Sequence, residues 1–160
     1  MRRQRGFSLI ELLIVIAIIL TIAAMAIPNL LRSKMSANEA SAVGSIRTIA
    51  TAETTYAVAY TNVGYADSLT KLAFPGSGQP VDQNHAGLID WVLGCASQPC
   101  NKAGYQFSIV NATGTPVSAY QVTATPQLAG QTGRRGFCGD QVPRLMYDPN
   151  GGTSCTVALQ

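Results

Sequence analysis

An apolar stretch from Leu12 to Ile27 constrains what this 160-residue chain can fold into. Thr21 is its only hydroxyl-bearing residue, and Pro28 ends it. At about 1.5 Å per residue, a helix from Phe7 to Ile27 is long enough to cross a hydrocarbon core roughly 30 Å thick. A helix of this length in a soluble core would normally keep a polar face, and this segment has none. We therefore expect lipid, or other copies of the same segment, to cover it.

Composition and charge exclude two broad classes of protein. Apolar residues make up 47% of the chain and charged residues 12%, whereas disordered chains are rich in charge and poor in apolar residues. Three of the eleven Lys and Arg residues lie within residues 1–6, and the other eight are balanced by eight Asp and Glu. The basic excess therefore belongs to the N-terminal tip, which favours a cytoplasmic N-terminus and predicts no contact with nucleic acid.

One acidic residue, Glu11, adjoins the apolar stretch. A carboxylate within a membrane segment costs about 2.5–3.5 kcal/mol on insertion scales, so it is expected to have a partner and a function. An alternative interpretation is a secretory signal peptide, with residues 12–22 as its apolar region and small residues at 24–26 as its cleavage site. Cleavage after Ala26 would then leave a secreted binding module.

The N-terminal segment resembles that of type IV pilins and the related pseudopilins. The matching features are a basic leader, Gly6, Phe7, Glu11 four residues later, the apolar helix, and Pro28. The resemblance is close over about the first 30 residues of this chain.

The resemblance implies that a prepilin peptidase cuts after Gly6 and methylates the new amine of Phe7. The apolar helix would hold the subunit in the inner membrane, where the assembly machinery would pack identical subunits into a helical filament. Glu11 would pair with the Phe7 amine of a neighbouring subunit, because burying either charge alone is costly. The implied function is that of a structural, non-enzymatic pilus subunit. The alternative within the family is a pseudopilin of a type II secretion system, in a periplasmic pseudopilus.

Helical sequence resumes at once after Pro28, so we interpret this proline as a kink and not as the end of the helix. The sequence predicts four parts: a leader over 1–6, a membrane or filament-core helix over 7–28, an amphipathic stalk helix over 29–60, and a head over 61–160. The membrane helix and the stalk helix should form one continuous helix from about Phe7 to about Tyr60, roughly 80 Å long. Its expected buried face carries Ala42, Ile46, Ile49, Tyr56 and Tyr60.

The rest of the chain predicts an α+β head, with a small antiparallel sheet of three to four strands packed on the helix. Residues 61–103 are expected to form a long connection with short helices near 68–72 and 86–93. Strands are expected at 105–110, 119–124, 134–138 and 143–147, with turns at 114–116 and 148–152.

Four cysteines in an exported chain predict disulfides, and four cysteines allow three connectivities. We favour Cys95–Cys100, a short loop closed by Pro99, together with Cys138–Cys155. The second pair resembles in position the C-terminal disulfide loop of many pilins. It should contribute about 3 kcal/mol in the loop-entropy model.

The sequence contains no recognised catalytic constellation, and its one histidine, His85, lies in a polar loop. We expect no cofactor and no resident metal. Asp140, Asp148 and Asn150 are weak candidates for calcium ligands, because pseudopilins bind calcium in a C-terminal loop. A tight turn at residues 148–151 is the favoured interpretation of the last two.

Overall fold

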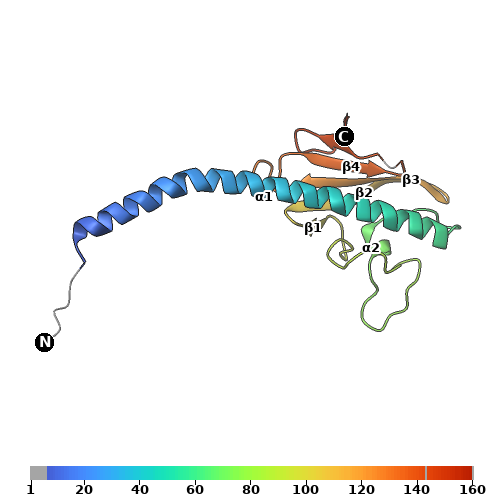
Figure 1. Cartoon of the computed structure of the whole chain (residues 1–160). Helices are drawn as coiled ribbons and strands as arrows, with labels where there is room; N and C mark the ends of the chain where they lie inside the picture. The colour runs from blue at the N-terminus through green and yellow to red at the C-terminus, as the bar shows by residue number, and fades with distance from the viewer. Residues whose placement is uncertain (1–6, 143, 160) are drawn as a thin grey trace. The chain divides into compact units, whose positions relative to one another are not determined.

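The computed structural model describes residues 7–142 and 144–159, and it has the predicted α+β class, with a long N-terminal helix and an antiparallel sheet (Figure 1). The predicted leader over 1–6, including Gly6 at the expected cleavage site, lies outside the described residues. The chain divides into two compact units, residues 1–34 and 35–160.

A single helix, α1 (Leu9–Ala59), runs through both units. We call its residues 9–34 the apolar half and its residues 35–59 the stalk half. Pro28 lies inside the helix, as expected. The proline ring removes one backbone donor. Polar side chains nearby bond to backbone carbonyls: Thr21 Oγ1 donates to Ala17 O at 2.8 Å, and Asn29 Nδ2 donates to Met25 O at 3.3 Å.

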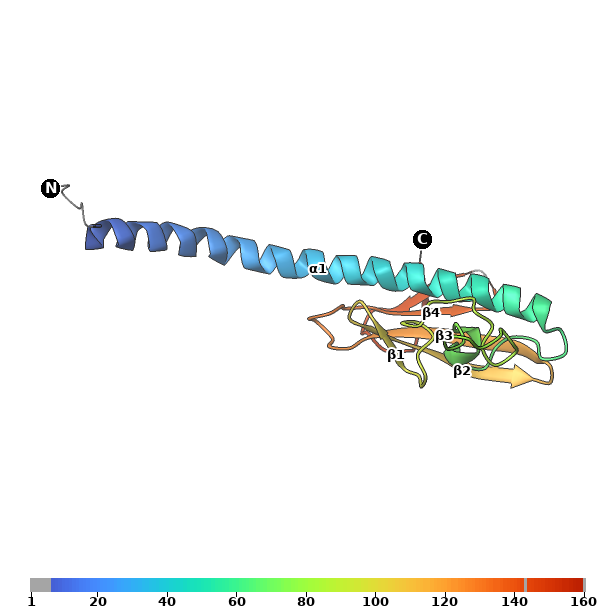
Figure 2. The ribbon, with the colours of Figure 1, turned by 90° about the horizontal axis from the view of Figure 1, so that it is seen from below.

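The stalk half buries one face. Its buried residues recur every three or four positions, as expected for one side of an α-helix. They are Ala42, Ser45, Ile46, Ile49, Ala52, Glu53 and Tyr56. The predicted face is therefore confirmed, except that Tyr60 is only half-buried and that Glu53 belongs to the face. Figure 2 shows the sheet lying along this half of α1.

The sheet has six antiparallel strands in sequence order, two more than the upper limit of the prediction. The central hairpin is long, and the outer strands are short. The strands are β1 (Cys100–Lys102), β2 (Tyr105–Gly114), β3 (Val117–Pro126), β4 (Gly136–Asp140), β5 (Met146–Asp148) and β6 (Val157–Ala158). The sequence analysis missed β1 and β6 because two or three residues are too few to show an alternating pattern.

Alternating side chains of β2 and β3 complete the core beneath α1. On β2, Tyr105, Phe107 and Ile109 are buried, and intervening residues are half-buried. On β3, Tyr120, Val122 and Ala124 face the same core. This period of two is the pattern that identified both strands in the sequence.

The connection between α1 and the sheet contains one of the two predicted helices, α2 (Leu69–Leu72). The helix predicted at 86–93 is wrong. Gly87 has a positive φ of 68°, and the amides of residues 86–89 donate to carbonyls of Lys71, Leu72 and Ala73. A positive φ at Gly87 lies outside the right-handed helical region, and the amides of Val92 and Leu93, which a helix over 86–93 would bond to its own carbonyls, donate instead to Oδ1 of Asp90.

The cysteines pair as the sequence analysis favoured, Cys95 with Cys100 and Cys138 with Cys155. The first disulfide closes the turn that leads into β1. The second joins β4 to the C-terminal segment across 17 positions of the chain. Both lie in the unit that contains the sheet.

Candidate assembly site in the apolar half of α1

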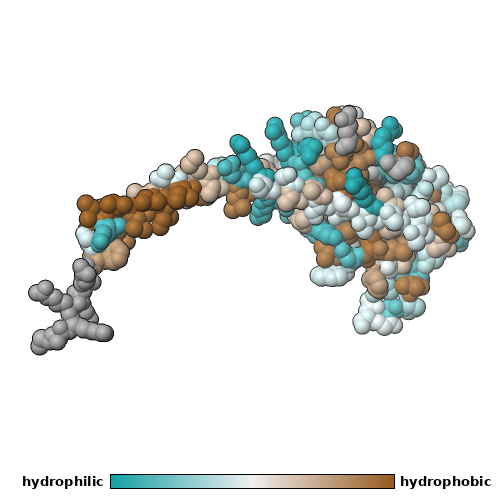
Figure 3. All heavy atoms as spheres, in the orientation of Figure 1, coloured by the Kyte–Doolittle hydropathy of each residue, from teal (hydrophilic) through white to brown (hydrophobic). Residues whose placement is uncertain are grey.

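The apolar half of α1 has no buried residue within its own chain. Its large apolar side chains are 44–79% exposed, counting Phe7 just before the helix. They are Phe7, Leu9, Ile10, Leu12, Leu13, Ile14, Val15, Ile16, Ile18, Ile19, Leu20, Ile22, Met25, Ile27, Leu30 and Leu31. Figure 3 shows them as a continuous apolar surface. The helix is long and apolar enough to cross a membrane, and a surface of this kind requires lipid or protein to cover it.

Glu11 is part of the helix N-terminus as well as a candidate for pairing between subunits. Its Oε2 accepts the backbone N–H of Ser8 at 2.9 Å, while Ser8 O accepts the N–H of Glu11 and of Leu12. With Leu9 as the first helical residue, Ser8 is the N-cap and Glu11 is the third residue of the helix. The contact is the half of a capping box in which the acid reaches back to the N-cap amide.

The structure brings Phe7, Ser8 and Glu11 within one helical turn, and Phe7 is 79% exposed. The sequence analysis identified Phe7 and Glu11 but missed the capping role of Glu11. The signal was present, because serine followed three residues later by glutamate before an apolar run is typical of a helix start.

A second glutamate of α1, Glu39, fixes the stalk half to the segment before β4. Its Oε1 accepts the backbone N–H groups of Arg134 and Arg135, and its Oε2 accepts Nε of Arg135 at 2.9 Å. Burial alone would raise the pKa of Glu39, but these hydrogen bonds and the Arg135 charge outweigh it and lower the pKa. This contact could not be predicted from the sequence, because Glu39 and its partner residues lie about 95 positions apart.

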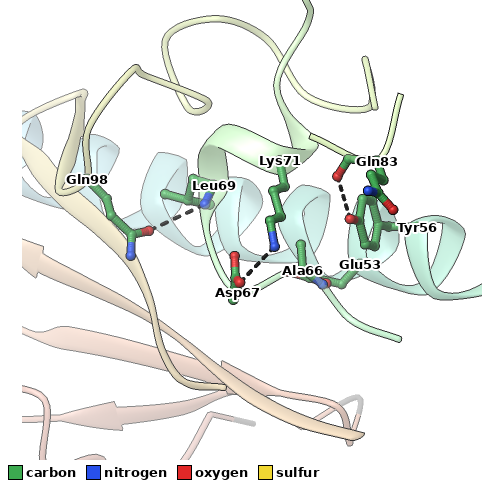
Figure 4. Close-up of polar contacts among 8 residues, drawn as sticks. All are labelled: Glu53, Tyr56, Ala66, Asp67, Leu69, Lys71, Gln83 and Gln98. Atoms are coloured by element: carbon green, nitrogen blue, oxygen red, sulfur yellow. Dashed lines mark hydrogen bonds and ion pairs between the residues drawn. The ribbon is translucent and has the colours of Figure 1, made fainter. Parts of the chain in front are cut away.

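A third glutamate, Glu53, has the opposite environment (Figure 4). Its side chain has no exposed area, and its Oε2 accepts the N–H of Ala66 at 2.8 Å. Its Oε1 has no hydrogen-bond partner in the part of the chain that the structure describes. Desolvation raises the pKa of Glu53 to about 8, with nearby Asp67 adding to the rise and the Ala66 bond opposing it. The sequence suggested only an interruption of the apolar face at this position.

The weak calcium candidates do not gather in one place. Asp148 pairs with Gly136 across the sheet, and Asp140 lies four residues farther along β4. At about 3.3 Å per residue, the two aspartates are roughly 13 Å apart along the strand direction, so one ion cannot bind both. The carboxylate of Asp148 instead accepts the N–H groups of Asn150 and Ser154, which supports the predicted turn. Within residues 7–142 and 144–159, no group of three or more His, Cys, Asp or Glu side chains could hold a metal ion.

Comparisons with known proteins agree with this arrangement. The family described as "Prokaryotic N-terminal methylation motif" matches residues 1–27. The type IV wide pilus major component PilA4 of Thermus thermophilus is 39% identical over 113 residues, which cover 71% of this chain and 69% of that protein. This chain belongs to the type IV pilin family.

The pilin also has a shorter match to the type II secretion system core protein G of Dickeya chrysanthemi. The two are 44% identical over 45 residues, which cover 28% of this pilin and 29% of that protein. No solved structure matches the pilin. The family is one of structural proteins, and the N-terminal motif and apolar helix are consistent with anchoring in a membrane and polymerisation into filaments.

Proposed function

We propose that this pilin is a structural subunit of a type IV pilus, held in the inner membrane before assembly and polymerised through the apolar half of α1. The observation that carries the proposal is the continuous exposed apolar surface of that half. Lipid covers it before assembly, and the same half of neighbouring subunits covers it in the filament. The overall similarity to a pilus major component supports this function.

Maturation would proceed by cleavage between Gly6 and Phe7 and methylation of the Phe7 amine. The matched methylation motif spans both residues. A prepilin peptidase would carry out these steps on the cytoplasmic side, where the basic leader remains. Mass spectrometry of the mature protein tests this directly. A chain that begins with N-methylated Phe7 is expected, and a chain that begins with Ile27 would instead identify a signal peptide and a secreted protein.

Assembly would depend on the negative charge of Glu11, which would pair with the Phe7 amine of a neighbouring subunit. The Ser8 N–H occupies one carboxylate oxygen of Glu11 in the single chain, so the other oxygen remains to accept from a neighbour. In a low-dielectric surrounding, opposite charges attract strongly and favour one register of packing.

Two substitutions separate the charge of Glu11 from its capping role. Glu11→Ala removes both, whereas Glu11→Gln keeps an oxygen that can accept the Ser8 N–H and removes only the charge. We expect both variants to fold and insert in the membrane but to form no filaments, as counted by electron microscopy of sheared surface material. Abundant filaments from Glu11→Ala would contradict the proposal. If Glu11→Gln forms filaments and Glu11→Ala does not, assembly depends on the capping hydrogen bond and not on the charge of Glu11.

A second candidate function is that of a pseudopilin in a type II secretion system. The N-terminal similarity to core protein G favours it. The same micrographs separate the two functions, because a pilus subunit forms long surface filaments and a pseudopilin at its native level does not.

A further inference from the structure

The buried carboxyl of Glu53 connects two parts of the head that are distant in the sequence. It projects from α1, and among residues 7–142 and 144–159 its one hydrogen bond is to the N–H of Ala66, in the connection that follows the helix. Ala66 is itself without exposed area. A buried backbone N–H requires an acceptor, and Glu53 supplies it.

The titratable and charged groups around Glu53 come from α1, from the connection that follows it, from α2 and from β3. Asp67 follows Ala66 and raises the pKa of Glu53. Tyr56 on α1 and Tyr120 on β3 lie close enough for the Glu53 charge to raise their own pKa values. The nearest cation on α2, Lys71, is bonded to Asp67 at 2.7 Å and not to Glu53 (Figure 4).

We propose that Glu53 is a proton-operated latch that holds residues 66–68 against α1 while it is neutral and releases them when it loses its proton. A neutral acid leaves a weakly polar oxygen at Oε1, which is tolerable in the core. An ionised carboxylate would leave a buried negative charge with one hydrogen bond and an aspartate beside it, which is costly. The raised pKa places this change near neutral to mildly alkaline pH.

The opening is confined by the contacts on either side of residues 66–68. Before them, Tyr65 N donates to Val117 O, and Val117 N donates to Val63 O, so the connection is pinned to the start of β3. After them, Leu69 N bonds to Gln98 at 3.4 Å, and Leu69 and Leu72 are buried. Loss of the Glu53 contact therefore frees a short segment between two anchors.

The latched segment leads into α2 and into the loop beyond it. That loop exposes three large apolar side chains, Phe74, Val81 and Trp91, which are 64%, 61% and 78% exposed. The latch acts on the segment that precedes α2 and this apolar loop. It is a property of the head and does not require filament assembly, although the proposed function would place it in the external medium.

Hydrogen exchange at the Ala66 amide tests the latch in the full chain held in detergent micelles. After correction for the intrinsic pH dependence of exchange, the opening equilibrium should rise by nearly tenfold per unit between about pH 5 and pH 8, because opening releases one proton. In Glu53→Gln the profile should be flat. Glu39→Gln is the matched control, since it removes a carboxylate from the same helix and should keep the wild-type profile at Ala66.

A flat profile in the wild-type chain, or a steep one in Glu53→Gln, would overturn the proposal. Should Glu53→Gln fail to fold, the wild-type chain decides the question alone. The chain has three glutamates, so ¹³C-labelling of glutamate gives three carboxyl signals. The latch requires the pKa of one of them to lie well above the ordinary carboxyl range and to match the pH dependence of Ala66 exchange. Titration of all three in the ordinary range would refute it. Filament counts of the same strains report on assembly separately.

Discussion

The two halves of α1 share one backbone conformation, but they differ in what covers their apolar side chains. The stalk half buries seven residues within its own compact unit, against the sheet and the connection that follows α1. The apolar half buries none, and its apolar side chains from Leu12 to Ile27 lie on all sides of the helix. The apolar face of the stalk half is covered by other parts of the same chain. The apolar half forms the same helix, but lipid or other protein chains must cover its surface.

The largest expected effect contrasts one isoleucine from each half. Ile46 has no exposed area, so Ile46→Ala should lower the free energy of unfolding of the head by roughly 2–5 kcal/mol. Ile16 is 44% exposed in the single chain, so Ile16→Ala should leave that free energy unchanged. Urea unfolding of both variants in micelles measures the difference. Equal losses would mean that the two halves are not energetically separate.

Removal of either disulfide should destabilise the head and leave the apolar half of α1 unaffected, because both disulfides lie within residues 35–160. Replacing Cys138 and Cys155 by serine should cost about 3 kcal/mol, and replacing Cys95 and Cys100 about 2 kcal/mol, because the shorter loop loses less chain entropy. Thermal unfolding followed by near-ultraviolet circular dichroism reports on the head. The helicity that remains after the head unfolds, measured in the far ultraviolet, should be the same in both double variants.

The contributions of Glu39 and Glu53 to the free energy of unfolding should change with pH in opposite directions. The lowered pKa of Glu39 means that its stabilisation is present above the ordinary carboxyl range and is lost as pH falls through the folded-state value. Glu39→Gln should therefore cost about 1 kcal/mol at neutral pH and less in acid. For Glu53, whose pKa is raised to about 8, stabilisation is complete below the ordinary range and is lost as pH rises toward 8. Unfolding curves from about pH 3 to pH 9 for wild type and both variants check these signs.

The smallest effect is expected at Pro28. Pro28→Ala restores a backbone donor at an exposed position of the apolar half, which belongs to a different compact unit from the head. The head's free energy of unfolding should therefore change by less than about 0.5 kcal/mol. The substitution should instead alter filament pitch or yield, measured by electron microscopy. A marked change in head stability would show coupling between the halves.

Sequence patterns were sufficient where a residue's role depends on near neighbours in the chain. The apolar run, the face with Ile46 and Ile49, and the alternation in β2 and β3 all have short periods and were recognised. The leader motif at Gly6 and Phe7 was recognisable for the same reason, because its residues are consecutive.

Long-range contacts set the limit of the sequence analysis. The segment around Gly87 has helix-compatible composition, but it is bonded along residues 71–73 and has a positive φ of 68° at Gly87, which is not a helical conformation. In the sequence, Glu53 only interrupts an apolar face, and its hydrogen bond to Ala66 is visible only in the structure. Glu39 likewise resembles an ordinary surface acid until its contact with Arg135 is known. Each of these partners becomes a neighbour only in the folded chain.

The lengths of the outermost strands have a consequence for polymerisation. A sheet offers unpaired amides and carbonyls at its two borders, and long borders invite stacking into amyloid-like ribbons. Here the borders are β1 and β6, of three and two residues. Strands this short offer few unpaired backbone groups for pairing between the sheets of neighbouring subunits. In the proposed filament, growth would therefore depend on the helix and not on these two strands.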